Sequence, residues 1–206
     1  MDDYMKSLGK KTRRHIKLKM NLIESDFPDF KVQYFEKSDI LFEQIGNIAL
    51  LNRNRMKSLK IKSYLNDEEC KFLYQYAATS GFGSIIICTI DNNMVGGYIN
   101  FIIGEHAYVY VGGYYTSYNK YSMGQVAMIY VFQYLIEEKN IKYCHLLDSA
   151  HGYKIHLGGI IHNIYTFWAF RNNGIYYFCR KAIRGFRFNY WKIYSVFIKL
   201  KKIFSV

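Results

Sequence analysis

The chain has 206 residues, half of them hydrophobic, and a formal net charge of +12. A chain of this length and hydrophobicity can bury a core, which excludes global disorder, and no uncharged apolar run approaches the roughly 18 residues of a membrane span. The positive charge favours an anionic partner: nucleic acid, phospholipid, or a phosphorylated cofactor or substrate.

A helix is predicted over residues 4–24, with one apolar and one basic side. The apolar side carries Leu8, Thr12, Ile16 and Ile23. The other side carries five cations with no carboxylate between them: Lys6, Lys10, Arg13, Arg14 and Lys17. These cations either form a solvated face or serve an anionic ligand. After the break at Pro28, alternating residues predict a strand over 30–35.

Two helices are predicted next. Ser38 or Asp39 can cap the first, which extends to about Met56. Asn66 can cap the second through its side chain, and Glu69 completes a capping box three residues later. This second helix is predicted to end near residues 80–81, at a glycine.

Three closely spaced strands then predict an antiparallel meander over residues 84–90, 94–103 and 107–114. A helix over 124–138 and a strand over 142–147 follow, and this strand must cross over to rejoin the sheet. A last strand is predicted over 161–169. The order of elements indicates the α+β class, with one domain over residues 1–186.

An amphipathic basic helix is predicted at the end of the chain, over about residues 188–204 within a segment 187–206. Its narrow polar stripe leaves a wide apolar face. That face packs on the domain or on a second subunit, or it lies at a membrane interface.

The stretch from Tyr108 to Tyr153 holds the candidate chemistry. A strand ending in Gly112-Gly113 precedes the tight segment Tyr121-Ser122-Met123-Gly124 at the start of a helix. Helix N-termini offer N–H donors to a phosphate, although an isolated glycine is equally typical of an ordinary turn. A helix end gives an anion only about 0.3–1 kcal/mol, whereas micromolar affinity needs about 8 kcal/mol. Other contacts must therefore supply most of the binding.

These motifs resemble the GNAT acyltransferase fold and, more closely, the GNAT-type acetyltransferases grouped with the cellulose-biosynthesis protein CelD. The resemblance spans roughly residues 4–170 and rests on three segments. The first is the basic stretch 7–14. The second is the strand end Gly112-Gly113-Tyr114-Tyr115 followed by the turn Tyr121-Ser122-Met123-Gly124. The third is Asp148 to Gly152 followed by Tyr153-Lys154. The chain departs from the family pattern at Met123, where proline is expected, and at Tyr115, where aspartate is usual.

The resemblance implies a mostly antiparallel central sheet with a parallel pair at the cofactor cleft, flanked by helices. It also implies binding of acetyl-CoA or another acyl-CoA, with the pantetheine arm along the fourth strand and the pyrophosphate at the glycine turn. Lys120 is the nearest cation in sequence to that turn. The predicted cofactor-binding residues are Tyr110, Val111, Gly112, Gly113, Lys120, Tyr121, Ser122, Met123, Gly124 and Gln125.

Acyl transfer requires the acceptor to lose a proton and the departing thiolate to gain one. Asp148 is a candidate base at the end of the fifth strand, or else a cap for the following segment. His151 is a second candidate base, or else a surface histidine. Tyr153 is the candidate acid. The predicted substrate-binding residues are Lys154, which would anchor an anionic acceptor, Arg13 and Arg14.

Three functions are consistent with these features. The first is transfer of an acetyl or acyl group to an amine or hydroxyl, with a sugar or cell-surface precursor as the acceptor that the resemblance implies. This would place the enzyme in polysaccharide biosynthesis, in the cytoplasm, as a homodimer or in contact with the membrane. The second is tRNA-dependent aminoacyl transfer of the Fem type, which the charge favours. The third is a non-catalytic protein that docks on membranes through residues 188–204.

Metal and disulfide chemistry are not expected. The histidines at 151, 156 and 162 are spaced unlike HExxH or any Cys/His zinc pattern. Four cysteines lie far apart, and the N-terminus shows no signal peptide. They are therefore predicted to be reduced thiols of a cytosolic protein: Cys70, Cys88, Cys144 and Cys179.

Overall fold

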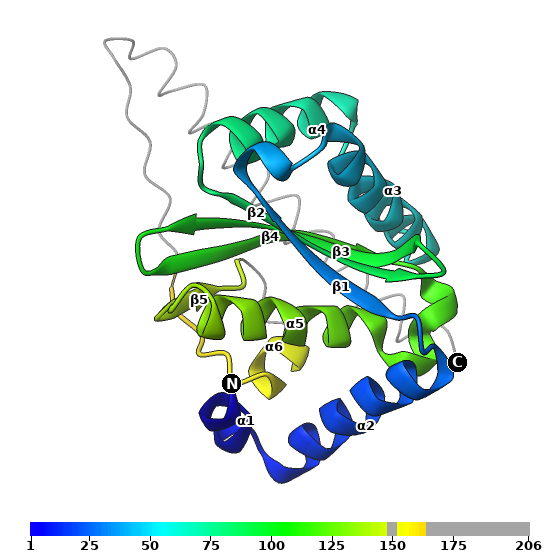
Figure 1. Ribbon diagram of the computed structural model, residues 1–206, viewed down its shortest axis with the longest axis vertical. Helices are drawn as coiled ribbons and strands as arrows, with labels where there is room; N and C mark the ends of the chain where they lie inside the picture. The colour runs from blue at the N-terminus through cyan, green and yellow to red at the C-terminus, as the bar shows by residue number, and fades with distance from the viewer. Residues whose placement is uncertain (148–151, 164–206) are drawn as a thin grey trace, which may run out of the picture. The chain divides into compact units, whose positions relative to one another are not determined.

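The computed structural model describes residues 1–147 and 152–163 (Figure 1). Residues 1–162 form one compact unit. Residues 161–163 have no regular structure. The rest of the predicted strand over 161–169, the boundary at 186 and the helix over 188–204 lie outside the described residues. Among the described helices, none has both the length and the hydropathy to span a membrane.

Five strands form one sheet in the order β1-β2-β3-β4-β5. Neighbouring strands are antiparallel, except that β4 and β5 are parallel. This arrangement confirms the predicted mostly antiparallel sheet with one parallel pair. The strands are β1 (Lys31–Glu36), β2 (Gly83–Ile90), β3 (Asn93–Ile103), β4 (His106–Tyr114) and β5 (Tyr143–His145).

Helices cover both faces of the sheet (Figure 1). On one face, α3 (Phe42–Ser58) and α4 (Asp67–Tyr74) pack against Ile85, Ile87 and Ile99. On the other, α1 (Asp2–Ser7), α2 (Lys10–Asp26) and α5 (Met123–Glu137) pack against Ile86 and Val109. Consecutive residues of β2 serve opposite cores because side chains alternate along a strand. A short helix, α6 (Gly152–His156), follows β5.

The helix caps show where local sequence decided the structure. Asn66 caps α4 as predicted, since its Oδ1 accepts the N–H of Glu69 at 2.8 Å. The predicted cap at Ser38 or Asp39 is wrong, because residues 37–39 form a short 3₁₀ turn. The chain then buries Ile40, and α3 begins at Phe42, where the Gln44 side chain accepts the Leu41 N–H at 2.8 Å.

The predicted N-terminal helix over 4–24 is divided into α1 and α2. Leu8 has extended backbone angles and is 4% exposed, and Gly9 forms the N-cap of α2. The break lets Leu8 enter the same core cluster as Ile16. The apolar periodicity was therefore correct, while the interruption at Gly9 was missed.

Strand β4 contains a bulge that changes the direction of the side chains at its carboxyl end. Ile99 pairs with Val111 and Asn100 with Val109, so Tyr110 is the extra residue. Val109 packs on the α5 side, whereas Val111 packs on the α3 and α4 side. The side chains after the bulge therefore point to the opposite face of the sheet from the one they would have in a regular strand.

Candidate active site

The two parallel strands pair over only three positions. Strand β5 pairs with β4 through Tyr108, while β4 continues to Tyr114. In the described part of the chain, residues 109–114 thus have no strand partner on the β5 side. Such an edge presents main-chain N–H and C=O groups that an extended ligand can pair with.

The start of α5 lies just beyond that edge, after a 3₁₀ turn over Thr116–Tyr121. Ser122 is the N-cap residue in the left-handed region (φ 53°), and its side chain does not cap the helix. The N–H groups of Met123 and Gly124 are the first two of α5 and have no acceptor within the helix. The N–H groups of Gln125 and Val126 instead donate to the Ser122 carbonyl, at 2.8 and 3.1 Å. Two donors therefore remain at the positive end of the helix.

A glycine is needed at position 124 because the Tyr114 side chain packs against it. A Cβ atom at this position would lie 2.5 Å from Cε1 of Tyr114. Its carbonyl accepts the hydroxyl of Tyr98 at 3.0 Å. The Tyr114 ring therefore fills the space beside the Gly124 Cα, and only the main-chain N–H of this glycine could serve a ligand.

Gly112 and Gly113 hold β4 against its neighbours. A Cβ at Gly112 would lie 2.1 Å from the Tyr98 ring. One at Gly113 would lie 2.5 Å from the Ile48 carbonyl oxygen. Asn52, which is 7% exposed, donates its side-chain N–H to the Gly112 carbonyl at 2.8 Å. Gly113 thus lets α3 lie directly on the end of β4, and Gly112 makes room for the Tyr98 ring.

Tyr110 and Val111 face the α3 and α4 core. Tyr110 makes edge-to-face contacts with Tyr64 and Phe101, and Val111 is 7% exposed. Their side chains are therefore engaged in packing. Any cofactor contact from these two residues would come from the main chain.

Lys120 and Tyr121 are tied to α2. The Lys120 ammonium lies 3.1 Å from Oδ2 of Asp26, which also accepts the Tyr121 hydroxyl at 2.7 Å. The hydrogen bond from Tyr121, followed by that from Lys120, holds the pKa of Asp26 below its usual value. The predicted phosphate-binding charge of Lys120 is thus already paired with a carboxylate. Tyr121 is 7% exposed and belongs to the core.

The predicted acid, Tyr153, shares a site with Tyr114, from the Gly112–Tyr115 segment, and with Arg55, which the sequence did not single out. The Arg55 guanidinium lies over the Tyr114 ring, 4.9 Å from its centroid. Burial raises the pKa of Tyr153; the charge of Arg55 opposes this shift and Tyr114 adds to it. Arg55 comes from α3, Tyr114 from the end of β4 and Tyr153 from α6. Only tertiary packing brings them together, so no local pattern could reveal Arg55.

The remaining predicted residues are dispersed. The Lys154 ammonium donates to the Leu146 carbonyl at 2.6 Å and so connects α6 to the end of β5. Arg13 donates to the carbonyl of Lys6, and Arg14 is exposed on α2. The two candidate bases, Asp148 and His151, lie outside the described residues.

A histidine pair lies where β4 and β5 stop pairing with each other. His106 Nδ1 and His145 Nε2 lie 2.9 Å apart across the β4–β5 ladder, and Tyr108 stacks on His145 at 4.6 Å. Burial, followed by the charges of His106 and His162, lowers the pKa of His145 from its ordinary value of 6.5. The folded protein therefore favours the neutral imidazole.

This shift predicts a pH dependence of stability. The unfolded chain binds a proton at His145 at a higher pH than the folded chain does, so stability falls as pH falls. The contribution is fully present above pH 6.5 and is lost as pH falls through the lower folded pKa. We expect His145→Gln to have a smaller difference in unfolding free energy between pH 7.5 and pH 5 than the unsubstituted protein, measured by urea titration. The exposed control His156→Gln should retain the full difference, and an unchanged difference in His145→Gln would contradict the assignment.

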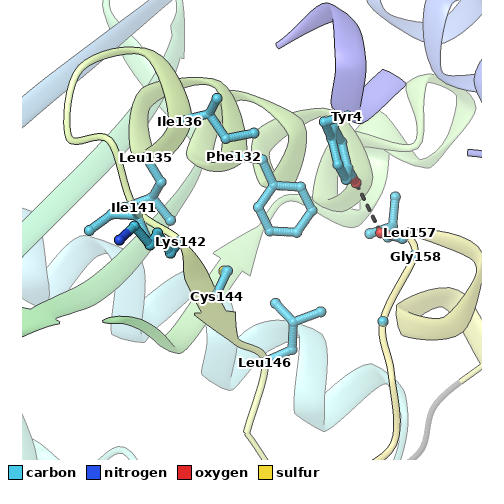
Figure 2. Close-up of a pocket in the computed structure, with 11 residues that line it drawn as sticks. Tyr4, Phe132, Leu135, Ile136, Ile141, Lys142, Cys144, Leu146, Leu157 and Gly158 are labelled. Carbon is cyan, nitrogen blue, oxygen red and sulfur yellow. Dashed lines mark hydrogen bonds between the residues drawn. The ribbon is translucent and has the colours of Figure 1, made fainter. Parts of the chain in front are cut away.

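The structure also has an apolar pocket of about 210 Å³ away from this site (Figure 2). It lies between α1, α5, β5 and the segment after α6. The Tyr4 hydroxyl donates to the Leu157 carbonyl at its rim, at 3.0 Å. Phe132, Cys144 and Leu146 line the interior. Lys142 is the sole charged residue among those that line it, and the lining includes no histidine or carboxylate.

Comparisons with known proteins agree with this fold. A possible acetyltransferase from Clostridium difficile 630 is 12% identical, with a TM-score of 0.55 over 69% of this chain and 99% of that chain. The aminoglycoside acetyltransferase meta-AAC0020, from an uncultured soil metagenomic sample, is 13% identical in its sisomicin complex, with a TM-score of 0.52 over 72% and 99%. No curated protein sequence matches the chain. The family model described as an acetyltransferase (GNAT) domain matches residues 10–155. The chain therefore belongs to the GNAT acetyltransferase family.

Proposed function

We propose that this protein transfers an acetyl group from acetyl-CoA to an amine or hydroxyl of a small, sugar-like acceptor. The observation that carries the proposal is the unpaired edge of β4 beside the uncapped start of α5. An extended amide-containing arm can pair with the first, and a pyrophosphate can accept hydrogen bonds from the second.

The residues present fit the ligand. Main-chain groups over residues 109–114 would pair with the pantetheine arm, and the N–H groups of Met123 and Gly124 would bind the pyrophosphate. Because the latter are backbone donors at a helix terminus, they need no cationic side chain. The ion pair of Lys120 with Asp26 is therefore compatible with binding.

When bound, acetyl-CoA supplies a thioester that an amine or hydroxyl can displace. Tyr153 would then act as the general acid that gives a proton to the departing sulfur. Its raised pKa keeps the hydroxyl protonated at neutral pH, as an acid requires. Asp148 or His151 would take the proton from the acceptor.

The acceptor class has weaker support. The soil aminoglycoside acetyltransferase was also solved in complex with trehalose, a sugar, at 13% identity and a TM-score of 0.50. Lys154, Arg13 and Arg14 remain the proposed acceptor contacts. Fem-type transfer and membrane docking, which rest on the net charge and on residues 188–204, stay predictions, as do the homodimer and the peripheral membrane contact.

Acetyl-CoA binding tests the proposal directly. At a concentration of about 100 times the Kd, the ligand should stabilise the protein by about 2.7 kcal/mol, seen as a rise in Tm. Gly124→Val should abolish this rise, because its side chain would clash with the Tyr114 ring and force the start of α5 away from the end of β4. The control is Gly9→Ala, where a Cβ meets nothing within 4 Å. No rise in Tm at millimolar acetyl-CoA would reject the function.

A further inference from the structure

The basic side of α2 lies against the proposed pyrophosphate turn. His15 Nε2 is 3.4 Å from the Ser122 hydroxyl, and the Lys19 ammonium donates to the Lys120 carbonyl at 2.5 Å. At the other end of α2, Asp26 binds Tyr121 and Lys120. The helix is therefore fixed beside residues 120–122, the three residues that precede α5.

The first three turns of α2 carry cations without carboxylates. Its two acidic residues, Glu24 and Asp26, lie in the last turn and are engaged by the hydroxyls of Tyr130 and Tyr121, respectively. Within the described ranges, no ion pair involves any of the helix's six cations: Lys10, Lys11, Arg13, Arg14, Lys17 and Lys19. Positive charge at a helix N-terminus is unfavourable, so folding alone gives no reason for this arrangement.

Three of the basic residues share one stripe. Lys11, His15 and Lys19 are spaced four residues apart and therefore follow one another along a single side of α2. Since His15 and Lys19 already touch the 120–122 turn, Lys11 lies one helical turn further along the same stripe. It is exposed, as is His15.

We propose that Lys11, His15 and Lys19 form a subsite for the 3′-phosphate of the CoA nucleotide. This inference rests on the proposed function. The 3′-phosphate is a monoester one ribose away from the pyrophosphate, and it carries about −1.5 to −2 charges at neutral pH. Charge-assisted hydrogen bonds from this stripe would make the protein distinguish CoA from dephospho-CoA, which lacks only that group.

Calorimetric titration of the full chain with CoA and with dephospho-CoA, at about 0.15 M salt, tests the subsite, since screening then suppresses distant charges. We expect CoA to bind about tenfold to a hundredfold more tightly. In Lys11→Gln and His15→Gln the ratio of the affinity for CoA to that for dephospho-CoA should fall towards one, because the affinity for CoA falls and that for dephospho-CoA is unchanged. That unchanged affinity also shows that the variants are folded.

The matched control is Lys17→Gln, which removes one exposed charge about 200° around the helix from Lys19. It should keep the full ratio. Equal affinities for the two ligands in the unsubstituted protein would overturn the subsite and leave the acetyltransferase proposal standing. An equal loss in Lys11→Gln and Lys17→Gln would also overturn it, because the effect would then come from general charge, as in binding to RNA or anionic membranes. Failure to bind either ligand would overturn both proposals.

Discussion

Replacing Gly113 by alanine is expected to lower the free energy of unfolding by about 3 kcal/mol or more, at the upper end of overpacking effects. The new Cβ would lie 2.5 Å from the Ile48 carbonyl oxygen and 2.6 Å from the Asn52 nitrogen. Both are backbone atoms of α3, so no side-chain rotation can relieve the clash. The helix must move away from β4, which also weakens the 2.8 Å hydrogen bond from Asn52 to Gly112.

Urea or guanidinium titration with linear extrapolation measures this change. Gly46→Ala is the matched control within α3, because a Cβ there meets nothing within 4 Å. It should raise stability by about 0.5–1 kcal/mol, since alanine favours a helix interior over glycine. If Gly113→Ala cost less than about 1 kcal/mol, the close approach of α3 to the end of β4 would be wrong.

The same glycine shows what sequence reasoning could and could not predict. The Gly112-Gly113 pair predicted the end of a strand, and β4 does end at Tyr114. The structure adds that these glycines serve the packing of Tyr98 and α3. A glycine in a sequence indicates that a side chain would not fit at that position, but it does not indicate which neighbouring residue occupies the space.

Local signals predicted most of the fold. Alternating residues located β1, and the turns between closely spaced strands located β2, β3 and β4. The cap at Asn66 was correct because a capping side chain and its target lie three residues apart. Strand β5 was predicted over 142–147 but pairs only over Tyr143–His145. Its length is set by the divergence from β4, a tertiary property.

The candidate site was predictable only where its parts are contiguous in sequence. The turn at Ser122 and the helix that follows it form one segment, so their relation could be predicted. Arg55 lies 59 residues from Tyr114 in sequence, and His15 lies 107 residues from Ser122. Their roles depend on how α3 and α2 cross the sheet and α5, which no short spacing encodes.

Replacing Tyr153 by phenylalanine is expected to reduce kcat about a hundredfold or more, within the range typical of lost general acids. The substitution removes one hydroxyl from a side chain that is 37% exposed, so the fold and the Kd for acetyl-CoA should be unchanged. A loss in kcat with unaltered cofactor binding is what a transition-state proton donor predicts. Steady-state kinetics and calorimetric titration together measure both quantities.

The pH profile adds a second criterion. Burial raises the pKa of Tyr153 above its ordinary value of 10, so the acid stays protonated throughout the neutral range. Tyr153 therefore adds no alkaline decline in kcat within the neutral range. Tyr153→Phe should lower kcat at every pH of that range without shifting the acidic limb of the profile. Tyr76→Phe, on an exposed ring that packs with Phe72, is the control and should keep full activity. If Tyr153→Phe also kept full kcat, the proton would come from another group or from water, and the cluster of Arg55, Tyr114 and Tyr153 would serve binding instead.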